Sequence, residues 1–256
     1  MAGEFFRRLG LHFGWLPTPE LSEIKIDNAP GFMRGLRALF VSDVHLRKAA
    51  SERQLAALMA LMATQKADLI LLGGDYAEAP AQGLRFFEAL SGIDAPLGIY
   101  AVMGNNDREC FPEIEKLRKM MADGGVKLLC NECAAAEIGG GRLLIGGCDD
   151  HKHGSPRTRD LFAGAADYRI LISHFPVLPD CACELMLSGH THGGQLCLGR
   201  LSPYSIGYER RYGMLALQGL HRTENRLLLV SRGIGVSRLP LRAGAAPQMH
   251  LLKFTG

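Results

Sequence analysis

Side chains that can bind metal ions fall into five short blocks of this 256-residue sequence. The blocks supply carboxylate and amide oxygens and imidazole nitrogens but no thiolate, and such ligands suit Mn, Fe or Zn. Seven donors exceed the four ligands of one tetrahedral zinc site, so two divalent ions are expected, with Mn as the first candidate. The predicted ligands are Asp43, His45, Asp75, Asn105, His174, His190 and His192.

A pair of divalent ions would give these residues hydrolytic chemistry. Two cations about 3.5–4 Å apart acidify a water molecule and hold the attacking and leaving oxygens of an in-line displacement. Asp75 lies between the other candidates in chain order and is the natural bridging carboxylate. Each block alone would also pass as a turn or a structural histidine. The prediction of a phosphoesterase therefore rests on all five blocks occurring together.

The elements that precede these blocks must position them. Each block follows a short apolar segment typical of a buried strand, and helical patterns separate several of these segments. Because ligands bind beyond the carboxyl ends of strands in open α/β sheets, one sheet edge should gather all five blocks. We predict strands at 24–27, 36–41, 68–72, 98–102, 143–145, 169–172, 185–187, 227–230 and 249–254, and helices at 54–64, 83–90, 112–122 and 156–162.

The alternation of strands and helices predicts an α/β fold in a single domain, since no linker rich in Pro, Gly or Ser divides the chain. Residues 221–226 place turn residues between two apolar runs and predict a hairpin. Residues 1–20 form an N-terminal segment whose aromatic side chains surround Arg7 and Arg8, ahead of the domain at 21–256. Packing on the domain is the favoured interpretation, because the hydrophobic periodicity is not clean; an anchor on a membrane surface is the alternative.

Together, the five blocks resemble those of the calcineurin-like metallophosphoesterase superfamily. The resemblance covers about residues 21–256 and implies a four-layer α/β/β/α sandwich. It also implies that a metal-bridging hydroxide attacks a phosphodiester or pyrophosphate bond. By position, the resemblance implies that one ion is held by Asp43, His45, Asp75 and His192, and the other by Asp75, Asn105, His174 and His190.

Further stretches are similar to a bacterial branch of the superfamily that holds membrane-associated phosphodiesterases. These stretches are 189–195, 230–235, 239–242 and 246–248. Some members of that branch cleave the pyrophosphate of UDP-2,3-diacylglucosamine, so the likeness implies a lipid- or nucleotide-linked substrate. Two alternatives stay open, namely a phosphomonoesterase and a scaffold that keeps the fold without catalysis.

Residues 106–108 are the candidates for catalysis and substrate binding. Asn106 stands where the family usually has a histidine that is thought to protonate the leaving group. An amide can hydrogen-bond a phosphoryl oxygen but donates no proton at neutral pH. Because a general acid typically contributes ~10²–10⁴-fold, good leaving groups are favoured. Asp107 is expected to orient the loop or the metal-bound water, and Arg108 to clamp phosphate or to lie on the surface.

Charge and composition limit the classes of binding partner and the cellular locations that are expected. Residues 200–242 hold eight of the arginines and two acids, which suits either an anionic ligand or a solvated basic face. The aromatic residues do not interleave with basic ones, so nucleic-acid binding is not favoured. No apolar run approaches the ~20 residues that span a bilayer, and seven cysteines show no disulfide framework. A cytoplasmic protein is expected, with peripheral membrane contact as the alternative.

Overall fold

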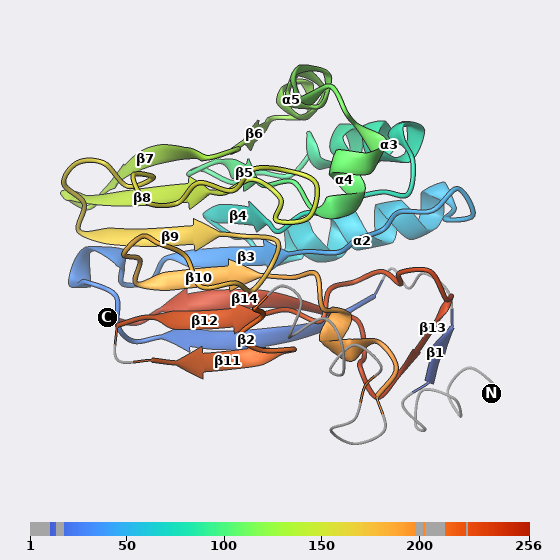
Figure 1. The fold of residues 1–256 in the computed structure, drawn as a ribbon. Helices are drawn as coiled ribbons and strands as arrows, with labels where there is room; N and C mark the ends of the chain where they lie inside the picture. The colour runs from blue at the N-terminus through green and yellow to red at the C-terminus, as the bar shows by residue number, and fades with distance from the viewer. Residues whose placement is uncertain (1–10, 14–17, 198–201, 203–212, 224) are drawn as a thin grey trace.

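The computed structural model describes residues 11–13, 18–197, 202, 213–223 and 225–256. Short apolar segments form strands, which assemble into two six-stranded sheets with a shared core between them (Figure 1). The predicted single-domain α/β sandwich is confirmed. A further two-stranded pair joins β1 (Leu11–Phe13) to β13 (Leu241–Ala243), so the described part of the N-terminal segment lies against the domain.

The first sheet carries the first three predicted ligand blocks. Its strand order is β2-β14-β3-β4-β5-β6, with β3 to β6 parallel and β14 antiparallel to β3. The apolar runs are buried on both faces of this sheet, as expected for parallel strands. The strands are β2 (Glu20–Ile26), β3 (Arg37–Val41), β4 (Leu69–Leu72), β5 (Ile99–Ala101), β6 (Val126–Leu128) and β14 (Gln248–Phe254).

The second sheet carries the two histidine blocks. Its order is β11-β12-β10-β9-β8-β7, with β8, β9, β10 and β12 parallel and antiparallel strands at both edges. The predicted hairpin is confirmed as the β11–β12 pair. The strands are β7 (Glu132–Ile138), β8 (Gly141–Gly147), β9 (Tyr168–Ile172), β10 (Leu185–Ser188), β11 (Gly219–Arg222) and β12 (Leu227–Val230).

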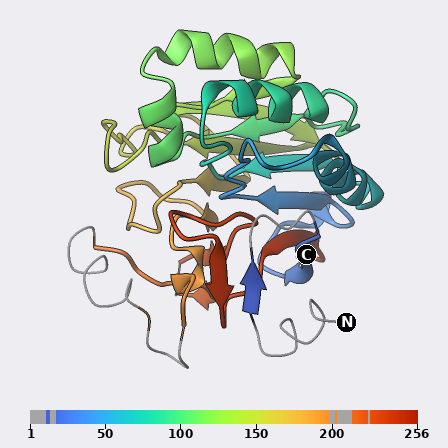
Figure 2. The same ribbon diagram turned by 90° about the vertical axis from the view of Figure 1, so that its right-hand side faces the viewer.

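Helices gather on one side of the two sheets (Figure 2). The largest of them, α2, begins with a capping box in which Ser51 Oγ accepts the Gln54 N–H and Gln54 Oε1 accepts the Ser51 N–H. Its apolar stripe packs with α3 and α5 on the first sheet. The helical elements are α2 (Glu52–Thr64), α3 (Pro80–Leu90), α4 (Asn105–Cys110), α5 (Ile114–Asp123), and the 3₁₀ turns η1 (Gly31–Met33) and η2 (His192–Gly194).

Two helix predictions need correction. The helix predicted at 156–162 is wrong, because these residues form a loop. A segment this short gains little from helical hydrogen bonds alone, so its contacts decide its conformation. Bonds to distant residues hold it instead, such as that from Arg157 N–H to Asn131 Oδ1 at 2.8 Å. In the described residues, loops rather than helices therefore cover the outer face of the second sheet. The helix predicted from Pro112 begins at Ile114.

Strands β3, β4, β9 and β10 point their carboxyl ends toward the same side of the molecule (Figure 1). Within each sheet the shared direction follows from parallel pairing, of β3 with β4 and of β9 with β10. The loops that leave these strands therefore meet at one edge of the sandwich. Within the described ranges, no helix is long and apolar enough to cross a membrane.

Candidate metal centre

The five predicted blocks come together at this edge of the sandwich. Asp43 follows β3 and Asp75 follows β4, which are hydrogen-bonded neighbours. His174 follows β9 and His190 follows β10 in the facing sheet, while Asn105 begins α4 after β5. All seven predicted ligands are buried, with at most 8% of their surface exposed. A site assembled from loops after five different strands is therefore in place.

One cluster joins Asp43, His45 and His192, whose ligand atoms lie within 4.8 Å of one another. His45 Nε2 lies 3.1 Å from His192 Nε2, which is itself 3.5 Å from Asp43 Oδ1. The fourth residue expected at this ion, Asp75, places its Oδ2 atom 3.4 Å from His45 Nε2. The structure thus brings together the whole predicted set for the first ion.

A second cluster joins Asp43, Asp75 and His174. Asp75 Oδ2 lies 3.4 Å from His174 Nε2 as well as from His45 Nε2, so one oxygen faces both clusters. His190 Nδ1 lies 3.2 Å from His174 Nε2. Asp43 belongs to both clusters, whereas the sequence placed it at the first ion alone. Two carboxylates therefore lie between the clusters.

These spacings suit two metal ions. Nitrogen and oxygen ligands bind such ions at about 2.0–2.2 Å, so two ligands of one ion lie about 3–3.5 Å apart. The ring nitrogens and carboxylate oxygens described above are separated by 3.1–3.5 Å. Asn105 Oδ1 is buried and accepts no hydrogen bond from the part of the chain that the structure describes. The donor set is therefore chemically suited to hold two divalent ions.

The loops that carry the ligands approach one another closely and are strained. A Cβ atom on Gly104 would overlap Asp75 Oδ1, and one on Gly189 would overlap Asp43 Oδ2. Glycine is therefore required at both positions. Left-handed backbone conformations in other residues cost about 1–3 kcal/mol each and persist only where the surroundings impose them. Positive φ angles of 43–69° occur at Asp43, His45, Asp75, His190 and His192.

Burial and neighbouring charges keep Asp75, His190 and His192 in the form that binds metal ions. Burial raises the pKa of Asp75, but the charge and hydrogen bond of His174, together with the electrostatic influence of His45 and His190, outweigh it and hold the carboxyl well below its usual range. Burial likewise lowers the pKa of His174, but Asp75 reverses the shift and raises it to about 10. Burial and neighbouring rings lower the pKa of His190 and of His192 well below the usual value. An ionised Asp75 beside neutral His190 and His192 is the state that metal binding needs.

Glu78 supports the centre from behind His45, a role the sequence did not single out. Its Oε1 atom lies 2.6 Å from His45 Nδ1 and accepts the proton of that nitrogen. This bond leaves His45 Nε2 directed toward His192 and Asp75. Carboxylates that hold a ligand histidine in this way orient the ring and raise its basicity. The signal in the sequence was an acid three residues after Asp75.

Arg242 supports the centre from behind His192. The side chain is fully buried, and its Nη2 lies 3.0 Å from His192 Nδ1. The same guanidinium donates to the carbonyl oxygens of Gly235, His192 and Ala245 at 2.7–3.2 Å. A buried arginine is rare unless its donors are satisfied in this manner. Arg242 lies in the 239–242 stretch, which carried a resemblance but no predicted role.

Asn106 and Asp107 take different positions. Asn106 lines the pocket over the clusters, with Nδ2 3.2 Å from His45 Nδ1 and its backbone N–H donating to Asp75 Oδ1. Asp107 is 1% exposed and accepts backbone N–H groups of Asp75, Tyr76 and Gly104 at 2.7–3.0 Å. The Asp107 carboxylate therefore orients the loop, which is one of the two roles expected of it.

Arg108, expected either to clamp phosphate or to lie on the surface, binds a buried carboxylate. Its Nε and Nη2 atoms bind the two carboxylate oxygens of Asp149 at 2.9 and 2.5 Å. Asp149 is 4% exposed and also accepts the backbone N–H groups of Asp150 and Ser155. Arg108 does not line the pocket over the clusters, because α4 presents it to the loop after β8. In this structure Arg108 therefore forms an ion pair with Asp149 and does not face the clusters.

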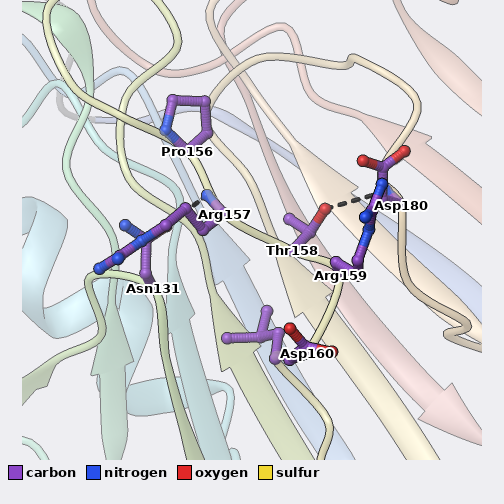
Figure 3. Close-up of a pocket in the computed structure, with 8 residues that line it drawn as sticks. Asn131, Pro156, Arg157, Thr158, Arg159, Asp160 and Asp180 are labelled. Carbon is purple, nitrogen blue, oxygen red and sulfur yellow. Dashed lines mark hydrogen bonds between the residues drawn. The ribbon is translucent and has the colours of Figure 1, made fainter.

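Two of the pockets that described residues line bear on the predicted site. The larger, of about 450 Å³, runs along the loop at 156–161 and contains none of the predicted ligands (Figure 3). Its two arginines, Arg157 and Arg159, point away from each other and form no converging anion site (Figure 3). The smaller pocket, of about 240 Å³, opens over the clusters and is lined by Asp75, Glu78, Asn105, Asn106, Glu109, Lys152, His190, Ser237 and Arg238.

The arginine-rich region at 200–242 is divided among several roles. Arg222 pairs with Asp27 at 2.7 Å and Arg232 with Glu20 at 2.6 Å. Arg242 is buried behind His192, and Arg238 lines the smaller pocket. In the described residues this region is therefore not one basic face. Arg200, Arg210 and Arg211, together with the aromatic residues Tyr204, Tyr208 and Tyr212, lie outside the described residues.

This sandwich with buried carboxylate and imidazole clusters at its strand ends defines a class of metal-dependent phosphoesterases. A family model named calcineurin-like phosphoesterase matches residues 36–194, a range that contains all five blocks. The chain belongs to this family, so the superfamily prediction is confirmed. The narrower likeness to UDP-2,3-diacylglucosamine pyrophosphohydrolases stays a prediction.

Bacterial relatives align over most of the chain. The uncharacterized protein YpbG of Bacillus subtilis (strain 168) is 29% identical, over 86% of this chain and 82% of that protein. The uncharacterized metallophosphoesterase YkuE of the same strain is 28% identical, over 88% and 81%. The phosphodiesterase YaeI of Escherichia coli (strain K12) is 29% identical, over 89% and 83%.

Proposed function

We propose that this protein hydrolyses a phosphodiester or pyrophosphate bond with two divalent metal ions, manganese being the first candidate. The observation that carries the proposal is the position of Asp75 Oδ2, 3.4 Å from both His45 Nε2 and His174 Nε2. A carboxylate oxygen that faces two imidazole-bearing clusters is the arrangement a dinuclear centre needs. Such ions, when bound, would acidify a water molecule and stabilise charge on the attacking and leaving oxygens.

The residues of the chain hold and orient the parts of this centre. Glu78 and Arg242 fix the rings of His45 and His192 from outside the ligand set. Asn106 lies at the pocket, where its amide N–H can donate to a phosphoryl oxygen. One ion would be held by Asp43, His45 and His192, the other by Asn105, His174 and His190, with Asp75 shared.

The pocket favours a diester or a pyrophosphate over a monoester. Asn106 cannot protonate an alkoxide leaving group at neutral pH. The missing proton donor should slow substrates that release a stabilised anion the least, because their cleavage depends least on general-acid catalysis. The name of the relative YaeI, a phosphodiesterase that is 29% identical, supports the same substrate class.

The test compares Asp75→Asn with Asp94→Asn, a matched change at an exposed carboxylate. Manganese-loaded wild-type protein and Asp94→Asn should cleave bis-p-nitrophenyl phosphate, and faster than p-nitrophenyl phosphate. Asp75→Asn should lose more than about 100-fold in kcat, because removal of a shared ligand exceeds the effect of losing an outer contact. Metal analysis should give two ions per chain for the first two proteins and fewer for Asp75→Asn. Equal rates in all three proteins would refute the proposal.

The alternatives predict other outcomes of the same experiment. A phosphomonoesterase would cleave p-nitrophenyl phosphate faster than the diester. A scaffold would bind metal without turnover on any substrate, including a nucleotide-linked lipid. Contact between the N-terminal segment and a membrane stays a prediction, since residues 1–10 and 14–17 lie outside those described.

A further inference from the structure

The pocket over the ligand clusters contains both acidic and basic side chains, and its acids are already engaged. Asp75 faces His45 and His174. Glu78 is bound to His45 at 2.6 Å. The third acid, Glu109, lies 2.7 Å from His153 and 3.3 Å from Lys152. Each carboxylate of the pocket lining therefore has a partner.

The two cations that line the pocket, Lys152 and Arg238, differ in whether an acid pairs with them. Lys152 pairs with Glu109, whereas Arg238 is exposed and pairs with no acid in the described ranges of the chain. A guanidinium at the mouth of a pocket, with its N–H donors directed to no neighbouring carboxylate, is available to an anionic ligand. Among the described residues that line the pocket, Arg238 is therefore the cation without an acidic partner.

The backbone around Arg238 is held in place by a side chain of the metal-binding loop. Gln195 Oε1 accepts the Ser237 N–H at 2.9 Å. Gln195 Nε2 lies 3.0–3.1 Å from the carbonyl oxygens of Ser237, Leu239 and Leu241. Arg238 is therefore anchored on both sides by the residue that ends the 189–195 stretch, close behind His192. These bonds fix the backbone from which the Arg238 side chain extends.

Arg238 and Gln195 have the same strained backbone conformation as several of the ligand residues. Arg238 has φ +55° and Gln195 has φ +47°, in the left-handed region that residues with a Cβ avoid. Such strain clusters at functional sites, where the surroundings impose it. Nine non-glycine residues of the described chain have positive φ, and seven of them belong to this centre: Asp43, His45, Asp75, His190, His192, Gln195 and Arg238.

We propose that Arg238 binds a phosphate oxygen of the substrate, the role that the sequence suggested for Arg108. This inference rests on the proposed hydrolysis and adds to it a substrate that keeps a negative charge at the mouth of the pocket. The planar guanidinium can donate two parallel N–H bonds to one phosphate group. Gln195 acts as a positioning residue, because it fixes the backbone from which Arg238 extends.

The first test replaces Arg238 by other residues that carry a Cβ atom, so the strain of the left-handed backbone at this position stays the same. In Arg238→Gln the side chain keeps most of its length and loses its charge, and KM for bis-p-nitrophenyl phosphate should rise about 10- to 100-fold. The kcat should stay within about threefold, since a charge that binds ground and transition states alike changes KM alone. Arg238→Lys should fall between the two proteins, because it keeps the charge without the fork. Arg159→Gln, at an exposed arginine outside this pocket, is the matched control.

Binding of inorganic phosphate to the metal-loaded protein gives a readout that needs no turnover. Calorimetric titration should show at least about tenfold weaker phosphate binding in Arg238→Gln and in Gln195→Leu than in wild-type protein and Arg159→Gln. The double variant Arg238→Gln/Gln195→Leu should be no weaker than Arg238→Gln, since both changes remove one contact. Phosphate affinity and KM within twofold of wild type in Arg238→Gln would overturn the inference. If wild-type protein hydrolyses no phosphoester, the proposed function fails while the phosphate titration still decides the role of Arg238.

Discussion

The Arg108–Asp149 pair provides a test of whether Arg108 is structural or binds substrate. We expect Arg108→Met to lower the free energy of unfolding while KM for a diester stays within about threefold. Both side chains are largely buried, with 15% and 4% of their surface exposed. Removing one partner of a buried pair costs about 3–5 kcal/mol, because the other charge is left unpaired. Asp149 keeps the backbone N–H groups of Asp150 and Ser155, so the expected loss is about 2–3 kcal/mol.

The loss of unfolding free energy in Arg108→Met should be fully present at neutral pH. Burial raises the pKa of Asp149, but the bonds from Arg108 and the backbone outweigh it and bring the value below the usual 3.8. A carboxyl with a lowered folded-state pKa contributes stability above its unfolded pKa and loses it as the pH falls through the folded pKa. The difference between wild type and Arg108→Met should therefore be constant above about pH 5 and shrink in stronger acid.

The assay is urea unfolding of metal-free protein followed by circular dichroism, so that metal binding does not contribute. Arg222→Met is the control, since Arg222 and Asp27 are 57% and 64% exposed and an exposed pair contributes less than about 1 kcal/mol. Arg108→Met/Asp149→Leu should recover much of the loss, because no buried charge is then unpaired. A loss below 1 kcal/mol together with a tenfold rise in KM would show that Arg108 binds substrate and that our reasoning is wrong.

Two further predictions concern His45 and His250. Glu78→Gln should weaken manganese binding about 10- to 100-fold, because a neutral amide oxygen holds His45 Nδ1 less firmly. Competition calorimetry measures this, with the exposed Glu115→Gln as control, and equal affinities would contradict the role given to Glu78. Burial lowers the pKa of His250 to about 3, so the unfolded chain binds a proton near pH 6.5 that the folded chain excludes. From pH 7.5 to pH 5 this residue should remove about 2 kcal/mol of stability, and His250→Leu should flatten that fall in urea titrations of metal-free protein; identical pH dependence in both proteins would exclude the effect.

The sequence by itself located the strands and the ligand-bearing turns that follow them. This was possible because both are local features: an apolar run such as 69–72 forms a buried strand, and the polar residue after it lies at the strand end. Parallel pairing then brings strand ends to one edge whatever the detailed packing. The five ligand blocks, the sandwich and the family could accordingly be predicted from residue types and order.

Only the tertiary structure decided which other side chains reach the centre. Arg108 is three residues from Asn105 in sequence and turns away to Asp149, whereas Arg238, more than a hundred residues further on, lines the pocket. Arg242 is likewise brought behind His192 by folding of a distant segment. The direction of a side chain depends on how its element packs and on contacts far along the chain, and neither leaves a local pattern in the sequence. The loop at 156–162 has the same explanation, because bonds to residues from other segments replace a helix that was locally possible.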